Sequence, residues 1–438
     1  MRKNLFLLAT IVLSGAMLSC SSSDDDVDLG EAKTVVNMLS ESIPIRLTQE
    51  QQVFANDNNR FTLNFLKTVN DGDQSGQSFI YSPLSITYVL GMVNDAATGQ
   101  TEQELEQTLG FHEGGIQAVN DYCKKLIDGL PKVDKDVTLD IANAIFVNKN
   151  NAKLKPQFEQ DMQTYYNAKA EALDFTASST LDHINGWCNE KTNGMIPSIL
   201  DEINPTMVSY LLNAIYFKAD WASKFDEKNT RDETFTNEEG HATTLPLMHQ
   251  NVLINYLKND TYRAIEMPYG NGSWKMTVML PEEGKTTDDI INRLANCGIL
   301  EGNGFCGTMG DNYGHYEVDL KLPRFETSSD TDLVPGRLIG LMQKMGIHLA
   351  FDRQYAEIPN MCEGPIYINM MRQKARIKVN EEGSEAAAVT IAGGMYTSGI
   401  IGPIEYPTAT FHANRPFVYV ISELRTGIIL FVGKFTGM

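Results

Sequence analysis

The stretch that decides the fold is Glu381-Glu382-Gly383-Ser384-Glu385-Ala386-Ala387-Ala388, where charged residues give way to small ones. Residues 374–382, which run into it, alternate polar and apolar side chains, which predicts a half-buried β-strand. Residues 386–404, which begin with its three alanines, carry no charge, and their first proline is Pro403. The octapeptide is therefore a polar hinge between a strand and a long uncharged segment.

Residues 383–397 can themselves form a strand, in which alternate side chains face the same side of a sheet. The side chains on one side are all small and uncharged: Ser384, Ala386, Ala388, Thr390, Ala392 and Gly394. Such a face slides beneath covering helices without the free-energy cost of burying a charge. The residues fit a loop that can become a strand, and they also fit an ordinary core strand followed by a glycine-rich turn.

The composition is that of a globular protein, with 438 residues, 42% of them hydrophobic and 21% charged. The net charge of −20 argues against a nucleic-acid partner, because phosphate binding needs a basic face. No internal repeat interrupts the chain after about residue 50, so one continuous domain over residues 51–438 is the simplest organisation.

Hydrophobic periodicity predicts helices in the first half of the chain and mostly strands in the second. The predicted helices are 52–69, 84–97 and 181–190. The predicted strands are 137–147, 209–217, 275–280, 316–322, 417–421 and 428–431. This segregation indicates an α+β domain.

The first 19 residues read as a secretory signal, with Arg2 and Lys3 followed by the apolar run 5–18. Met17-Leu18-Ser19-Cys20 resembles a bacterial lipoprotein processing box, which predicts lipidation of Cys20 and a flexible tether over residues 20–50. Residues 21–26, Ser-Ser-Ser-Asp-Asp-Asp, are either a solvated linker or an acidic tag similar to that of surface-exported lipoproteins. We expect export through the inner membrane and a lipid anchor in the outer membrane, facing either the periplasm or the outside.

The cysteines show no regular spacing. They are Cys20, Cys123, Cys188, Cys297, Cys306 and Cys362. After lipidation of Cys20 an odd number remains, which favours buried thiols that act as small hydrophobic groups. Cys297 and Cys306 are the one pair for which a disulfide is considered.

The sequence contains no catalytic or cofactor-binding motif in the structural context that such a motif requires. Residues 302–307 match a dinucleotide fingerprint by letter but do not sit in a strand–turn–helix unit. The seven histidines lack metal-ligand spacing, and Ser75 lacks the flanking pattern of a hydrolase nucleophile. We therefore predict no catalytic residue, no metal and no cofactor.

The hinge octapeptide closely resembles the hinge of the reactive-centre loop in inhibitory serpins. Further signatures of that family follow in the expected order over about residues 50–438: residues 79–86, 213–221, 322–325, 411–417 and 431–434. The resemblance implies a single α+β serpin-type domain with a large central, mainly antiparallel sheet and further sheets. It also implies about eight or nine helices and an exposed reactive-centre loop at about residues 381–410.

The resemblance also assigns roles to individual residues. The hinge comprises Glu381, Gly383, Ser384, Glu385, Ala386, Ala387 and Ala388. The residues that hold or release the sheet are Ser82, Ser85, Asn213, Trp221 and Gln373. Gln373 stands where the family usually has histidine, and a glutamine still donates and accepts hydrogen bonds.

The function implied is that of a suicide inhibitor, not an enzyme, which traps a serine or alternatively a cysteine endopeptidase as an acyl-enzyme. Counting from the hinge places the scissile bond at Thr397–Ser398, with Tyr396 and Met395 as alternative cleavage positions. These residues suit elastase-, subtilisin- or chymotrypsin-like targets. No Arg or Lys lies between Lys378 and Arg415, which argues against trypsin-like targets. A monomer is expected, and the alternative function is a non-inhibitory serpin-fold binding or carrier protein.

Overall fold

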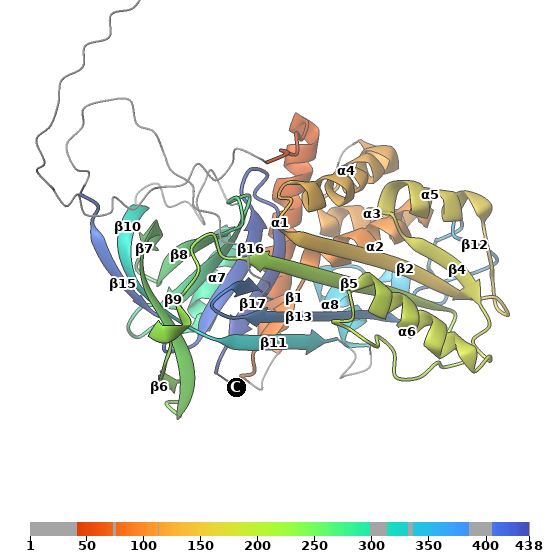
Figure 1. Ribbon diagram of the computed structural model, residues 1–438. Helices are drawn as coiled ribbons and strands as arrows, with labels where there is room; N and C mark the ends of the chain where they lie inside the picture. Colours follow the sequence, from red (N-terminus) through yellow and green to blue (C-terminus); the bar gives the residue numbers. More distant parts are fainter. Residues whose placement is uncertain are drawn as a thin grey trace, which may run out of the picture.

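The computed structural model describes residues 42–72, 76–112, 114–297, 313–331, 336–384 and 405–437 (Figure 1). These residues contain eight α-helices: α1 Gln49–Gly72, α2 Pro83–Ala96, α3 Gly99–Leu109, α4 Gly115–Gly129, α5 Pro156–Tyr166, α6 Ser179–Lys191, α7 Thr287–Cys297 and α8 Arg337–Met345.

Most of the strands follow α6. They are β1 Phe79–Tyr81, β2 Thr138–Asn148, β3 Lys153–Leu154, β4 Lys169–Leu173, β5 Ser209–Asp220, β6 Arg231–Thr236, β7 Ala242–Lys258, β8 Tyr262–Tyr269, β9 Trp274–Pro281, β10 Gly314–Pro323, β11 Phe325–Asp330, β12 Cys362–Glu363, β13 Met371–Val379, β14 Gly383–Ser384, β15 Thr408–His412, β16 Phe417–Glu423 and β17 Ile429–Phe435.

Two large sheets organise these strands. A six-stranded sheet has the order β11-β13-β14-β5-β2-β4, and a nine-stranded sheet has the order β1-β17-β16-β9-β8-β7-β10-β15, with β6 paired to β7. A third, two-stranded sheet joins β12 and β3. Most strand pairs are antiparallel, so the expected α+β fold with a mainly antiparallel central sheet and further sheets is confirmed.

Around the middle of β5 the six-stranded sheet is covered on both faces, because successive side chains of a strand point to opposite sides. Odd-numbered side chains such as Ile215 and Phe217 belong to the main hydrophobic core together with α1 and α2. Even-numbered side chains such as Leu212 and Ala214 pack with Trp187 of α6 on the opposite face. The ribbon of α6 lies over this part of the sheet (Figure 1). On β13, by contrast, Arg376 and Lys378 are exposed, so one end of this sheet has an uncovered outer face.

The elements predicted from periodicity lie where expected, in α1, α2 and α6 and in β2, β5, β9, β10, β16 and β17. The short helices α3, α4, α5, α7 and α8 were not predicted. In α3 only Thr101, Leu105 and Leu109 are buried, a stripe too narrow to stand out from a polar sequence. The predicted domain start at residue 51 falls inside α1, and Ile45 and Leu47 already pack against the core.

Three cysteines, Cys123, Cys188 and Cys362, are buried free thiols, as predicted. Burial raises the pKa of each thiol to about 12, so they are chemically inert at neutral pH. Cys297 is disulfide-bonded, so the prediction of a free thiol is wrong for it. Its suggested partner, Cys306, lies outside the described residues.

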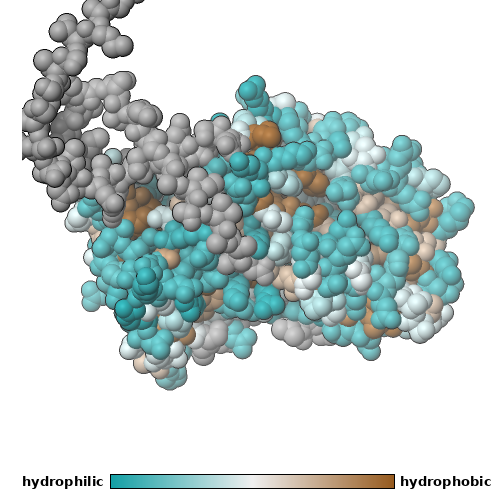
Figure 2. All heavy atoms as spheres, in the orientation of Figure 1, coloured by the Kyte–Doolittle hydropathy of each residue, from teal (hydrophilic) through white to brown (hydrophobic). Residues whose placement is uncertain are grey.

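The surface is polar over most of the face seen in Figure 2, as the strong negative charge requires. The large hydrophobic side chains exposed in the described ranges are Ile43, Val53, Tyr313 and Tyr355. In the same ranges, no helix combines the length and apolar character that crossing a membrane demands.

Candidate functional site

The central strands of the six-stranded sheet, β5 and β13, run parallel and diverge. They pair directly from Met371–Leu211 to Lys374–Ala214. At the other end β14 lies between them and pairs with both. Among the described residues no ladder joins residues 215–218 to residues 375–378. Their separation therefore grows from one strand spacing, about 4.8 Å, to two, about 9.6 Å, and we call this diverging stretch the slot.

The hinge residues Gly383 and Ser384 form β14 at the wide end of the slot. Gly383 fits only because it has no side chain, since a Cβ there would lie 2.1 Å from the carbonyl oxygen of Ala219. Ser384 is buried, and its Oγ is 2.8 Å from the hydroxyl of Tyr269 beneath the sheet. The first two small residues of the hinge are thus already part of the sheet.

Glu381 anchors the turn that leads into β14. Its side chain is only 3% exposed, and both carboxylate oxygens lie 2.7 Å from Nε of Arg324. The hydroxyl of Thr230 donates a further hydrogen bond. Burial alone would raise the pKa of Glu381, but the hydrogen bonds from Arg324 and Thr230 outweigh it and hold the pKa below its ordinary value of 4.5.

Trp221 closes the wide end of the slot from the β5 side. Its ring stacks on Tyr269 with centroids 4.3 Å apart, and its Nε1 donates to the carbonyl oxygen of Asn380 at 2.9 Å. Its backbone N–H donates to the carbonyl oxygen of Glu382 at 2.8 Å. Trp221 therefore holds the hinge turn through both side chain and backbone.

The other four predicted sheet residues meet at the narrow end, where β5 and β13 pair directly. Gln373 Nε2 donates to the carbonyl oxygen of Ser82 at 2.9 Å and to Asn213 Oδ1 at 3.3 Å. Gln373 Oε1 accepts from the backbone N–H of Ser82 at 3.1 Å. Ser82 Oγ lies 3.0 Å from Ser85 Oγ and donates to the carbonyl oxygen of Leu430 at 2.7 Å. Gln373 thus links both slot strands to α2, whereas Trp221 stands apart at the opposite end of β5.

A segment that sequence reasoning missed crosses the outer face of the narrow end. Residues 192–208, which follow α6, are attached to β13 because Lys374 Nζ donates to the carbonyl oxygen of Ser198 at 3.0 Å. Arg372, almost fully buried, pairs with Asp201 of the segment at 3.0 Å. No local pattern marks these contacts, because each joins positions more than 170 apart in the chain.

The remaining predicted site residues lie outside the described residues. They are Glu385, Ala386, Ala387 and Ala388 of the hinge, the cleavage positions Met395, Tyr396, Thr397 and Ser398, and the lipidation site Cys20. The structure therefore places Glu381, Gly383 and Ser384 of the hinge and all five of the sheet residues.

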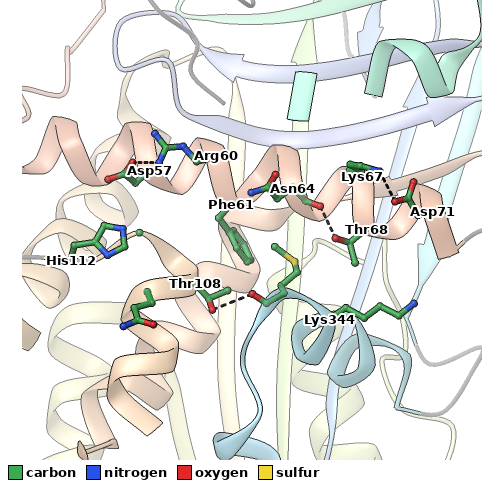
Figure 3. Close-up of a pocket in the computed structure, with 13 residues that line it drawn as sticks. Asp57, Arg60, Phe61, Asn64, Lys67, Thr68, Asp71, Thr108, His112 and Lys344 are labelled. Atoms are coloured by element: carbon green, nitrogen blue, oxygen red, sulfur yellow. Dashed lines mark hydrogen bonds and ion pairs between the residues drawn. The ribbon is translucent and has the colours of Figure 1, made fainter. Parts of the chain in front are cut away.

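The molecule has a groove at a distance in sequence from the slot residues, lined by α1 and the ends of α3 and α8. It has a volume of about 430 Å³ (Figure 3). Its charged rim is largely self-compensated, since Arg60 pairs with Asp57 at 3.3 Å and Lys67 with Asp71 at 2.6 Å. Such a rim gives little reason to favour a charged ligand.

The two-residue strand β14 thus lies between two central strands that diverge. Residues 56–437 match the family described as Serpin (serine protease inhibitor). The chain belongs to the serpin family.

The similarity to known relatives extends over nearly the whole length of those proteins. A protein described as Serpin B6 from Macaca fascicularis is 29% identical over 391 residues, covering 88% of this chain and 99% of the relative. A leukocyte elastase inhibitor from Xenopus tropicalis is 29% identical over 388 residues, covering 86% and 97%. The crystal structure of human thyroxine-binding globulin is 26% identical, with a TM-score of 0.72, and covers 88% of this chain and 98% of the globulin.

The Glu381 contact predicts a pH dependence of the native fold. A carboxylate whose pKa is lowered by folding stabilises the folded state fully above pH 4.5, and this contribution is lost as the pH falls through the lowered pKa. Glu381→Gln is expected to destabilise the native form by about 1–3 kcal/mol at pH 7 and to reduce the loss of stability on acidification below pH 4.5. Urea unfolding of both proteins between pH 3 and 7 measures this.

The matched control is Glu326→Gln, which removes a second carboxylate–arginine pair from the same sheet. Glu326 and Arg376 lie 2.6 Å apart, but both are nearly half exposed. This control should change stability by less than about 1 kcal/mol. Equal effects of the two substitutions would contradict the role assigned to Glu381.

The Gln373 contacts predict that Gln373→Ala loosens the narrow end of the slot. The substitution leaves the buried amide of Asn213 and the backbone of Ser82 short of partners, at a cost of about 1–3 kcal/mol. Gln373→His keeps one donor and one acceptor, so it should cost less. Denaturant unfolding monitored by tryptophan fluorescence tests this, and an alanine variant as stable as the parent would refute it.

Proposed function

We propose that this serpin inhibits endopeptidases as a suicide substrate, by inserting its cleaved loop into the slot. The observation that carries the proposal is β14, a two-residue strand that already pairs with β5 and β13 and stops where the slot continues. The chain supplies no catalytic group for this function and needs no cofactor.

The strand registers support insertion along the whole slot. Continued in the register of β14, position 390 lies opposite both Asn213 and Gln373, which are themselves partners in the direct ladder below. An inserted strand thus fits both flanking strands without a register shift. It reaches the end of β5 at Gly394, ten residues and roughly 33 Å beyond Ser384.

The chemistry comes from the protease. Its serine or cysteine nucleophile attacks the carbonyl carbon of Thr397, the peptide bond to Ser398 breaks, and the new amino group leaves with the proton. The protease is then an ester or thioester of the loop. Insertion carries it along the sheet before water hydrolyses the bond, so the outcome depends on two competing rates.

The proposed targets follow from the loop residues. A threonine at the cleavage position suits a small specificity pocket, as in elastase- or subtilisin-like enzymes, and Tyr396 or Met395 suits chymotrypsin-like ones. The relative described as a leukocyte elastase inhibitor supports this class. We expect the inhibitor to act as a monomer, since insertion uses only its own sheet.

One observation favours a second candidate, a carrier. The thyroxine-binding globulin that shares this fold is described as a complex with thyroxine. The groove in Figure 3 offers a volume suited to a small molecule. The small residues of the hinge favour inhibition, because a carrier has no need of a loop that can enter the sheet.

A lipid anchor in the outer membrane is also proposed. It is supported by the processing box before Cys20 and by the disulfide at Cys297, which suits an oxidising compartment outside the cytoplasm. A surface position would place the inhibitor against proteases from neighbouring cells or a host.

The trapping proposal predicts a complex with elastase, chymotrypsin or subtilisin that survives denaturing electrophoresis. Ala388→Glu should abolish it and leave a cleaved loop with active protease. This residue would face inward between Ile215 and Ala375, both buried, and a buried charge without a partner is costly. Mass spectrometry of the released C-terminal fragment identifies the cleaved bond.

Ala387→Glu is the matched control, because position 387 would face outward beside Arg376. It should trap nearly as well as the parent. Cleavage of the parent by every serine and cysteine protease tested, without trapping, would refute inhibition. Retention of a small molecule through purification would then support the carrier.

The anchor proposal predicts that the full-length protein incorporates radiolabelled palmitate and fractionates with membranes. Cys20→Ala should abolish both, since the lipid is attached through that sulfur. Protease treatment of intact cells shows whether the anchored protein faces the outside or the periplasm. Membrane association that persists in the Cys20→Ala variant would contradict lipidation.

A further inference from the structure

Lys224 connects the hinge turn, residues 380–382, to the end of β5 through two carboxylates. Its Nζ lies 2.5 Å from Oε2 of Glu382 in the turn and 2.9 Å from Oδ2 of Asp220, the last residue of β5. The three side chains are between 21% and 33% exposed, so solvent screens the two ion pairs only in part. Burial alone would lower the pKa of Lys224, but the hydrogen bonds with Glu382 and Asp220 outweigh it and raise the pKa above its ordinary value of 10.5, so the ammonium group is charged at neutral pH.

The two carboxylates lie at the point where β14 first meets β5. Asp220 pairs with Gly383 in the ladder between the two strands, and Glu382 is the residue directly before Gly383. One ammonium group therefore joins the two chains at the first pair of this ladder. The backbone N–H of Trp221 donates to the carbonyl oxygen of Glu382 at 2.8 Å, which joins the same two chains through the backbone.

The backbone pairing of β14 with β5 is short. The strand consists of Gly383 and Ser384, whereas strands in globular proteins usually have about three to ten residues. Glycine contributes no side-chain packing and loses more conformational freedom on folding than any other residue. The other carboxylate of the turn, Glu381, pairs with Arg324, which precedes β11 on the far side of β13, so that pair holds the turn to the β13 side.

We infer that Lys224 is a positioning residue that pins β14 to β5 in the register that the structure shows. Gly383 determines which register is possible, because only a residue without a Cβ fits against the carbonyl oxygen of Ala219, and Lys224 keeps β14 docked in that register. The consequence for trapping rests on the proposed function. A docked β14 is the end from which the inserted strand grows, so the pin favours insertion over hydrolysis of the acyl-enzyme.

Hydrogen exchange followed by mass spectrometry tests the pin without any protease. Lys224→Met keeps the aliphatic stem and removes the charge. In this variant the amides of Trp221 and Phe225, which donate to carbonyl oxygens of the hinge turn at 2.8 and 3.0 Å, should exchange roughly two- to five-fold faster, the factor expected for a partly exposed ion pair. Lys224→Arg keeps the charge and should exchange like the parent. Unchanged exchange in Lys224→Met would overturn the pin, whatever the protein does to proteases.

The matched control is Lys321→Met, which removes an ion pair of similar length and exposure elsewhere in the molecule. Lys321 and Glu233 lie 2.7 Å apart and are 22% and 35% exposed, compared with 24% and 33% for Lys224 and Glu382. Lys321 lies on β10, and its ammonium group contacts β6 instead of the hinge turn. Its removal should leave exchange of the two amides within about 1.5-fold of the parent. Equal acceleration in both variants would mean a general loss of stability and would overturn the pin.

The second measurement counts the inhibitor molecules that the mature protein consumes for each protease molecule trapped. Lys224→Met and Glu382→Gln should each raise this number roughly two- to five-fold. The double variant should add little further, because both substitutions remove the same ion pair. Lys224→Arg and the control Lys321→Met should both stay near the parent value.

The two measurements separate failure of the pin from failure of the proposed function. A parent that traps no serine or cysteine protease, with amide exchange accelerated in Lys224→Met alone, would support the pin and overturn the proposed function. A parent that traps, with the stoichiometry of Lys224→Met equal to that of the control, would overturn the role of Lys224 in insertion while the proposed function stands.

Discussion

Gly383 enters the sheet between β5 and β13 because it lacks a Cβ, which would otherwise lie 2.1 Å from the carbonyl oxygen of Ala219. Together with Ser384 it forms β14, which lies between the two central strands at one end while they stay paired at the other. A sheet held in this way leaves the backbone groups facing the slot without partners in the described strands. Under the proposed function, the inserted strand would supply these partners.

Contacts at both ends of the slot hold β5, β13 and the hinge turn in the arrangement that the structure shows. At the wide end, the buried carboxylate of Glu381 pairs with the partly exposed Arg324, and Trp221 stacks on Tyr269, which together fix the hinge turn. At the narrow end Gln373 joins both slot strands to α2. These are mainly polar contacts with defined geometry, and they break in a small displacement. Under the proposed function, these contacts would keep the slot closed until the loop is cleaved.

The two ends of the slot differ on the outer face of the sheet. Residues 192–208 are held to β13 by Lys374 and Arg372 over the narrow end, whereas the wide end is uncovered. Under the proposed function, a strand that grows from β14 would therefore meet the crossing segment only at its last residues. Displacement of packed side chains would oppose the insertion of those residues.

The sequence by itself determined the class of fold, the helices and strands with strong periodicity, and the hinge with its alternation of small residues. It did so because side-chain period, glycine and charge are local properties of the chain. It could not show that Trp221 lies at the opposite end of the slot from the other four proposed sheet residues. It also could not find α3, and it could not distinguish the free cysteines from the disulfide-bonded Cys297. Tertiary structure alone decided that Gln373 meets Ser82, 291 positions away, and that β14 pairs with both β5 and β13. Those contacts depend on strand order and register, which are set by packing across the whole sheet and leave no trace in any short stretch of sequence.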